Sequence, residues 1–284
     1  LYELLRVPSE RVQVVQDGDV VDLGGRTLRF LHAPWVHWPE TMFTYVEQDG
    51  LLFSCDFLGS HLATGELTTA GSGAELVGAK RYYAEIMMPF AAQVAKHLDR
   101  IEGLNIRMAC PSHGPVWSDP GVIRRAYRAW SSGPMANKVC LPFVSMHGST
   151  ELMVDALVDG LIRRGVGVER FELTGTDLGR IAMSLVDSAT IVVAAPTVLG
   201  GVHPVAAHAA FVANALRPRT QYLSVMTSYS WGGRAVEQLA AITSNIKAKL
   251  LDPVEVRGLP GPEDLRAIEG LAEKIAQSHA EAGL

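Results

Sequence analysis

The pattern of apolar and polar residues changes near residue 138. Beyond that point short apolar runs alternate with segments of helical periodicity. The predicted strands are 138–144, 167–173, 189–195, 220–226 and 250–257. The predicted helices are 149–164, 177–186, 204–216, 232–248 and 262–280. In the last helix Leu265, Ile268 and Leu271 fall on one face. This alternation predicts a doubly wound, five-stranded parallel sheet over residues 138–284.

The chain before residue 138 has a different pattern, in which short strand-like runs are separated by turn signals such as QDGD and LGGR. The predicted strands are 11–15, 27–33, 42–48, 51–56 and 106–110, and the predicted helices are 74–101 and 120–130. Residues 131–137 are predicted to form a linker. We therefore expect an α/β protein of two domains, at 1–131 and 138–284.

Composition narrows the class of protein. The 284 residues are 48% hydrophobic and 19% charged, with a net charge of -5, and no basic stripe indicates nucleic acid or an anionic membrane as a partner. No apolar run reaches the roughly 18 residues of a membrane span. The three cysteines, Cys55, Cys110 and Cys140, form neither a disulfide framework nor a CxxC motif. We expect a cytoplasmic protein in a reducing compartment.

Three loops rich in Gly, Ser and Thr follow predicted strands of the second half. They are SMHGST (145–150), PTVLGG (196–201) and SYSWGG (228–233). Ligands of doubly wound sheets bind at the carboxyl ends of the strands, and the first loop can surround a phosphate with N–H groups and hydroxyls at a helix N-terminus. It contains no Lys or Arg, which excludes a Walker-type nucleotide site. The alternative is that Ser149 only caps a helix and the glycines only form turns.

The first half contains candidate metal ligands. His37, Asp56 and His113 each lie in or beside a loop at the end of a predicted strand. Two imidazoles and a carboxylate suit iron, manganese or zinc. The alternative is that each histidine is a buried or capping residue and that Asp56 belongs to a turn.

The three loops of the second half together resemble the FMN site of the flavodiiron proteins, in the motifs S-M-x-G-x-T-E, P-T-x-x-G-G and S-Y-x-W-G-G. The resemblance implies a flavodoxin-like domain that binds FMN. The implied phosphate-binding residues are Ser145, Met146, His147, Gly148, Ser149 and Thr150. The residues implied beside the isoalloxazine are Pro196, Thr197, Val198, Leu199, Gly200, Ser228, Tyr229, Ser230, Trp231 and Gly232. The family often has an aromatic residue or Asn after Pro-Thr, whereas this chain has Val198 and Leu199 there. Trp231 is therefore the better candidate for flavin contact.

The segments HWPETM and PSHGPVW resemble the later ligand stretches of the metallo-β-lactamase-like domain of the same family. The resemblance implies that His37 binds one iron of a diiron centre, Asp56 bridges both irons, and His113 binds the second. The family's first ligand cluster, His-x-Glu-x-Asp-His, is expected before Leu1 and does not occur in this sequence. We therefore expect a partial αββα sandwich, with the missing ligands on a partner segment or lost by cleavage or truncation.

The resemblance implies an oxidoreductase that passes electrons from FMN to two Fe ions and reduces O2 to water, NO to N2O, or both. It also implies a head-to-tail homodimer. An external electron donor such as rubredoxin or a flavin or deazaflavin reductase is expected, because no CxxC pair occurs. The alternative is an FMN-binding electron-transfer module with an incomplete metal site. A zinc hydrolase with a β-lactamase fold is a third interpretation, and it leaves the flavin half without a use.

Overall fold

A parallel sheet organises the second half of the chain. Its strands are β8 (Ala136–Phe143), β9 (Gly167–Glu172), β10 (Ser188–Val198), β12 (Tyr222–Tyr229), β13 (Lys249–Leu250) and β14 (Val254–Arg257). β8 lies between β9 and β10, and β12 follows β10 and pairs with both β13 and β14. Counted along the chain, the main strands lie in the order 2-1-3-4-5, which is the flavodoxin-like arrangement. The predicted doubly wound parallel sheet is confirmed, with the predicted strand 250–257 divided into β13 and β14.

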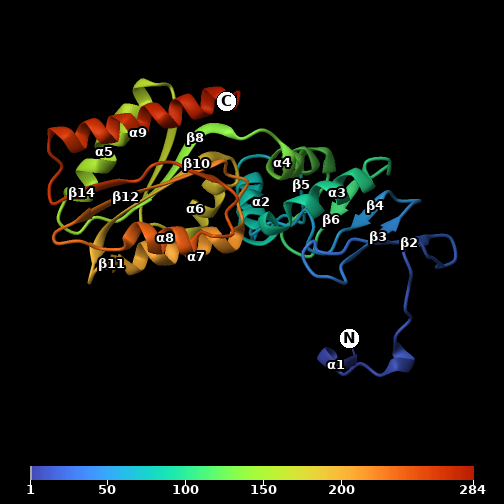
Figure 1. The fold of residues 1–284 in the computed structure, drawn as a ribbon. Coiled ribbons are helices and arrows are strands. Elements are labelled where there is room, and N and C mark those ends of the chain that lie inside the picture. The colour runs from blue at the N-terminus through green and yellow to red at the C-terminus, as the bar shows by residue number, and fades with distance from the viewer. Residues whose placement is uncertain (1) are drawn as a thin grey trace. The chain divides into compact units, whose positions relative to one another are not determined.

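Helices cover both faces of this sheet (Figure 1). α5 (Ser149–Arg163) and α9 (Pro262–Glu281) cover one face. α6 (Leu178–Leu185), α7 (Pro204–Leu216) and α8 (Ala235–Ile242) cover the other. The core between the sheet and the first pair is built from buried aliphatic residues such as Leu141, Leu157 and Ile268. The prediction of one helix over 232–248 was too long, because α8 ends where the Thr243 hydroxyl donates to the Leu239 carbonyl at 2.8 Å.

The computed structural model, which describes residues 2–284, shows a second seven-stranded sheet in the first half of the chain. Its strands in spatial order are β1 (Val20–Asp22), β2 (Thr27–His32), β3 (Met42–Val46), β4 (Leu51–Phe53), β6 (Met108–Cys110), β7 (Val116–Trp117) and β5 (Thr68–Thr69). The first four strands pair antiparallel, whereas β6 runs parallel to β4. Phe43, Leu52 and Ala109 on these strands are fully buried. This single mixed sheet corresponds to one of the two sheets of an αββα sandwich, as expected for a partial sandwich.

Three predictions for the first half were inaccurate. Residues 12–15 form no strand; a 3-10 turn at Ser9–Arg11 precedes them, and Val14 is 71% exposed. The helix predicted over 74–101 is divided into α2 (Ala74–Tyr82) and α3 (Ala91–Ile101) by a π-helical turn, Tyr83–Met87, and a 3-10 turn. Pro89 lies at that interruption and lacks the N–H that a continuous helix needs. The short strands β1, β5 and β7 were not predicted.

The contacts divide the chain into two units that do not follow the order of the sequence. Unit 1 contains the residues up to Ala79 and Phe90–Arg128, and unit 2 contains Lys80–Pro89 and Ala129–Leu284. α4 (Pro120–Ser132) extends across the boundary after Arg128. Residues 80–89 thus belong to the parallel-sheet unit although they lie in the first half of the chain.

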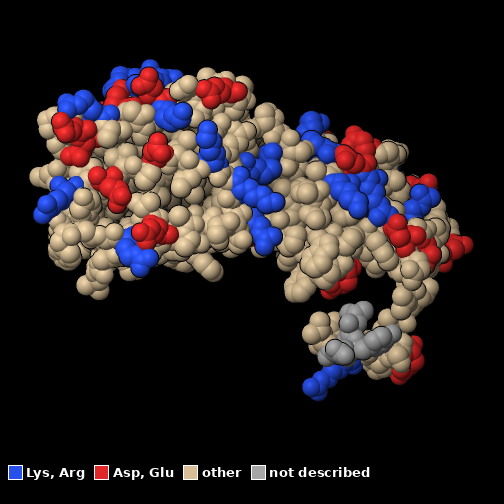
Figure 2. All heavy atoms as spheres, in the orientation of Figure 1, with Lys and Arg blue, Asp and Glu red and all other residues tan. Residues whose placement is uncertain are grey.

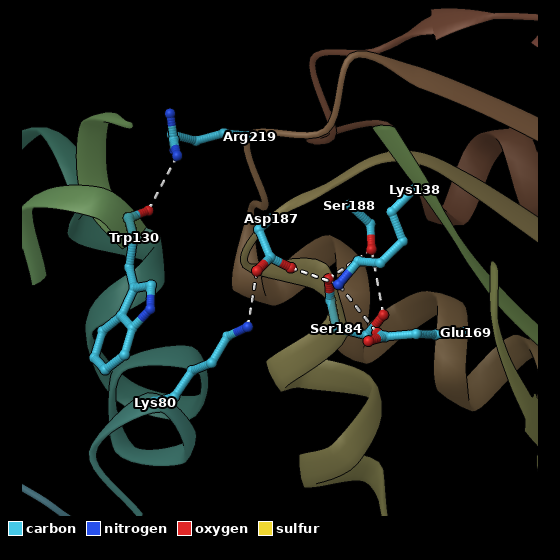
Figure 3. Close-up of polar contacts among 8 residues, drawn as sticks. All are labelled: Lys80, Trp130, Lys138, Glu169, Ser184, Asp187, Ser188 and Arg219. Carbon is cyan, nitrogen blue, oxygen red and sulfur yellow. Dashed lines mark hydrogen bonds and ion pairs between the residues drawn. The ribbon is translucent and has the colours of Figure 1, made fainter. Parts of the chain in front are cut away.

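Ion pairs join residues 80–89 to the rest of unit 2. Asp187, just before β10, accepts hydrogen bonds from the ammonium groups of Lys80 at 2.9 Å and Lys138 at 2.7 Å, and Lys138 also pairs with Glu169 at 3.2 Å (Figure 3). Burial by itself would raise the pKa of Asp187, but its bonds to Lys138 and Lys80 outweigh that effect and hold the pKa below its usual value. Nearby, the Arg219 guanidinium donates to the Trp130 carbonyl at 3.2 Å, near the end of α4 (Figure 3).

Charges of both signs are interspersed on the face drawn in Figure 2. Arg170, for example, pairs with Glu151 at 3.2 Å and Asp155 at 2.5 Å. Within residues 2–284, no helix is both long enough and apolar enough to cross a membrane.

The Asp187 ion pairs predict a stability difference. Asp187→Asn should lower the free energy of unfolding by about 1–2 kcal/mol at neutral pH, because it leaves two half-buried ammonium groups with less counter-charge. Since the native pKa of Asp187 is depressed, its contribution is present above pH ~4 and is lost as the pH falls through the native pKa. Urea unfolding at pH 7 and pH 3 measures both effects. Asp159→Asn on α5 is the control, and an equal effect of the two substitutions at pH 7 would contradict the role of the network.

Candidate functional site

The three predicted metal ligands lie together in unit 1. The Asp56 carboxylate is 3.1 Å from His37 Nε2 through Oδ2 and 3.4 Å from His113 Nε2 through Oδ1. The side chains are 13% exposed for Asp56, 28% for His37 and 56% for His113, so the site opens to solvent at His113. One carboxylate therefore lies between two imidazoles, with one imidazole at each oxygen.

Backbone hydrogen bonds position Asp56 and His113. Asp56 follows β4 and His113 follows the parallel strand β6. The Ser112 N–H donates to the Cys55 carbonyl at 2.7 Å, and the Ser60 N–H donates to the His113 carbonyl at 3.1 Å. The two ligand loops are thus bonded to each other on both sides of Asp56.

A buried histidine that the sequence analysis did not single out supports the loop of His37. His97 on α3 is 2% exposed, and its Nε2 lies 3.0 Å from the Pro34 carbonyl. A carbonyl only accepts, so Nε2 carries the proton. Burial lowers the pKa of His97, which keeps the imidazole neutral. Its position on the apolar face of α3, beside Val94, Leu98 and Ile101, was the available signal for burial.

The backbone around the ligands adopts uncommon conformations. Three non-glycine residues have positive φ values next to His37 and Asp56: Trp35 at 67°, Cys55 at 52° and Leu58 at 66°. Such conformations cost of order 1 kcal/mol each and cluster at functional sites. The surrounding structure must therefore hold these loops in place, as a ligand site requires.

Each oxygen of the Asp56 carboxylate faces a different imidazole. Among the residues that the structure describes, no group of three or more His, Cys, Asp or Glu side chains is arranged to hold a metal ion. The Asp56 oxygens contact His37 and His113 separately and do not converge with both imidazoles on one point. A carboxylate placed in this way can bridge two metal ions, each of which takes one imidazole from this chain. His32 is not part of the group, since its Nε2 lies 3.2 Å from the Val15 carbonyl.

In unit 2, the first predicted loop lies at the N-terminus of α5. Gly148 precedes the helix with φ of 87°, and the space beside its Cα is open, because an added Cβ would meet nothing within 4 Å. The Ser145 hydroxyl accepts from the N–H groups of Gly148 at 3.2 Å and Glu151 at 3.4 Å. The helix dipole and the first-turn N–H groups at this end favour an anion.

Thr150 has a different position from the other loop residues. It is 1% exposed, and its hydroxyl lies 3.0 Å from the hydroxyl of Ser228 at the end of β12. The Thr150 side chain is therefore engaged inside the protein and connects the first loop to the third. The structure thus brings these two loops together at the carboxyl ends of β8 and β12.

The second and third loops are also adjacent. The Arg234 N–H donates to the Gly200 carbonyl at 2.9 Å, and a Cβ on Gly233 would lie 2.4 Å from Cγ2 of Thr197. Large apolar side chains on the three loops are exposed: Leu199 is 98%, Trp231 83% and Met146 53% exposed. The last two residues of β10 pair antiparallel with β11 (Gly201–Val202) and form a short hairpin that was not predicted. These exposed groups are available to cover the faces of a planar ligand.

The chain is similar to several known proteins. The family model described as ODP family beta lactamase matches residues 2–114. The nitric oxide reductase of Moorella thermoacetica is 36% identical over 270 residues, which cover 93% of this chain and 68% of that protein. The flavodiiron protein from Giardia intestinalis has a TM-score of 0.83 at 27% identity, covering 95% of this chain and 69% of that one. The rubredoxin oxygen:oxidoreductase of Desulfovibrio gigas shares the fold, with a TM-score of 0.92 at 24% identity, covering 98% of this chain and 71% of that one.

Close packing of the ligand loops predicts a sensitive glycine. Gly114 has φ of 82°, and an added Cβ would lie 2.7 Å from the Ser60 Cβ. Gly114→Ala should lower the free energy of unfolding by about 2 kcal/mol or more, through backbone strain and overpacking. Urea unfolding measures the loss. Gly103→Ala is the control, because Gly103 has no positive φ and open space around it. An equal loss of unfolding free energy in both variants would contradict the role of close packing at Gly114.

Proposed function

The chain belongs to the flavodiiron family of oxidoreductases, and from this we propose that it reduces O2 to water, NO to N2O, or both, with FMN and two iron ions. The observation that carries the proposal is the carboxylate of Asp56, which lies between two imidazoles in a chain that also contains three adjacent flavin-type loops. One site without the other would serve a hydrolase or a flavodoxin. Both in one chain support electron transfer to a bound gas molecule.

The three loops of unit 2 are proposed to hold FMN. The backbone N–H groups at the start of α5, near Ser149, would hold the phosphate, and neutral donors suffice there because the helix dipole adds favourable charge. The loops 196–201 and 228–233 would border the isoalloxazine. Leu199 and Trp231 are the large exposed apolar side chains on these two loops. When bound, FMN supplies one- and two-electron redox chemistry. The open space beside Gly148, Gly200 and Gly232 is consistent with a ligand that approaches the backbone closely.

The metal ligands supplied by this chain are proposed to be His37 for one iron, His113 for the other, and Asp56 for both. Bound iron supplies the redox-active point at which O2 or NO binds. Asp56 would bind both ions and would offset part of their charge. The Asp56–His37 and Asp56–His113 distances support this assignment.

We further propose a homodimer and an external electron donor such as rubredoxin or a flavin or deazaflavin reductase. Exposed aromatic groups lie beside the metal ligands, with Trp35 48% and Trp38 55% exposed. Exposed apolar groups also lie on the flavin loops, as described for Leu199 and Trp231. Apolar surfaces of this kind next to both sites support an interface that includes them.

The second candidate function is an FMN-binding electron-transfer module. It is favoured by the small number of ligands, since the described residues offer only the Asp56 group and no set of three arranged around one ion. Iron content separates the two functions, because both predict bound FMN. Metal analysis together with donor-coupled O2 and NO consumption is the test. A flavin-loaded protein without iron and without turnover would favour the module.

The phosphate assignment predicts the effect of a charge at the start of α5. Ser149→Asp should weaken FMN binding by up to about a thousandfold, because two charges about 4 Å apart repel by roughly 4 kcal/mol at an effective dielectric of about 20. A carboxylate in the first turn stabilises the helix itself, so the fold should be retained. Fluorescence titration with FMN measures the affinity, and Ser149→Ala is the control. Equal affinity of the Asp and Ala variants would remove this helix end from the phosphate site.

The metal assignment predicts the effect of removing the shared carboxylate. Asp56→Asn should lower the affinity for Fe(II) at least tenfold, while FMN content stays at the wild-type level. Anaerobic reconstitution followed by metal analysis measures the iron, and the visible spectrum measures the flavin. Asp99→Asn, which removes an exposed carboxylate of unit 1 that pairs with Arg128, is the control. Undiminished iron binding by Asp56→Asn would reject the assignment.

A further inference from the structure

The hairpin formed by the end of β10 and β11 is held from outside by a residue of α8. The Gln238 side chain accepts a hydrogen bond from the Val202 N–H at 2.8 Å through Oε1. The carboxamide also lies against Gly201, where an added Cβ would be 2.7 Å from Oε1 and 3.2 Å from Nε2. Gln238 thus occupies the space that a side chain at residue 201 would need. None of the three loop motifs includes Gln238.

The hairpin that Gln238 contacts also lies close to the third loop. The Gly200 carbonyl of the hairpin accepts from the N–H of Arg234, which lies between that loop and α8. Gln238 lies one helical turn beyond Arg234, and its own N–H donates to the Arg234 carbonyl at 3.0 Å. The backbone of the first turn of α8 and the Gln238 side chain therefore hold the hairpin at two points, residues 200 and 202.

The third loop has a separate support. The Arg257 Nε–H at the end of β14 donates to the Ser230 carbonyl at 3.0 Å, and the Gly258 N–H donates to the Tyr229 carbonyl at 2.9 Å. β14 fixes that loop on one side, and α8 fixes the hairpin on the other. The base of the hairpin is held beside the third loop by the pairing of Pro196 with Ser228, and residues 201–202 are held by the bond between Gln238 and Val202.

We propose that Gln238 is a positioning residue of the flavin site: its carboxamide oxygen fixes the outer strand of the hairpin 196–202, which borders the isoalloxazine together with the loop 228–233. This rests on the proposed FMN binding. Gln238 acts through the hairpin and is not assigned any contact with the flavin. Loss of its acceptor should loosen one wall of the site while the sheet and α8 remain folded, because Gln238 is exposed and outside the core.

The test uses the full chain and FMN. Gln238→Ala should raise the Kd for FMN about three- to tenfold, which corresponds to the loss of one hydrogen bond. Gln238→Glu keeps an acceptor for the Val202 N–H and should return the Kd to within about twofold of wild type. The FMN reduction potential, measured at saturating FMN, should shift in Gln238→Ala. A purely structural loss would weaken oxidised and reduced FMN equally and leave the potential unchanged.

Gln277→Ala on α9 is the matched control, since it makes the same change at an exposed helical glutamine bonded to Glu281. It should leave both the Kd and the potential unchanged. Wild-type Kd and potential in Gln238→Ala would overturn the inference, and so would a loss of affinity that Gln238→Glu does not restore. Failure of the wild-type chain to bind FMN would overturn the proposed function instead.

Discussion

The parallel pairing of β4 with β6 is the constraint on which the candidate metal site depends. In this register Leu51 is opposite Met108 and Phe53 is opposite Cys110, so both strands end at the same edge of the sheet. Asp56 and His113 each lie three residues beyond these ends, and the bonds between their loops bring carboxylate and imidazole within 3.4 Å. An antiparallel partner for β4 would have placed one of the two at the opposite edge. Of the two parallel pairs in this mostly antiparallel sheet, the pair of β4 with β6 thus brings the candidate ligands together.

The same geometry builds the candidate flavin site. There all main strands are parallel, and the loops after β8, β10 and β12 meet at one edge. β8 and β10 are neighbours in the sheet but not in the chain, so the connections from them lead to opposite faces and leave a crevice. Thr150 and Ser228 then join the outer two loops by a buried hydroxyl pair. In both units the candidate residues lie beyond strand ends at one edge of a sheet, and the rest of each sheet holds those ends in register.

The sequence predicted which candidate residues lie close together more accurately than it predicted some of the elements. Strand-end placement of His37, Asp56 and His113 follows from apolar runs that stop just before them, and the glycine-rich loops follow from the same logic. The interruption at Tyr83–Phe90 was not predictable from periodicity, because the apolar residues continue through it. Strands of two or three residues, such as β5 and β7, have no period of their own and exist only through their pairing. The support from His97 and Gln238 depends on contacts between residues distant in sequence, which no local pattern encodes.

The assignment of Lys80–Pro89 to unit 2 has a consequence for the covalent path of the chain. The polypeptide passes between the units after Ala79, after Pro89 and after Arg128, so the two units are connected by three peptide bonds rather than one. Cutting any single bond therefore cannot release either unit intact. A fragment that begins at residue 138 would carry Asp187 and Asp177 without Lys80 and Arg81, their partners in the native chain. The change of sequence pattern near residue 138 therefore does not mark the boundary between the two units. A break in the chain within residues 131–137 would divide unit 2.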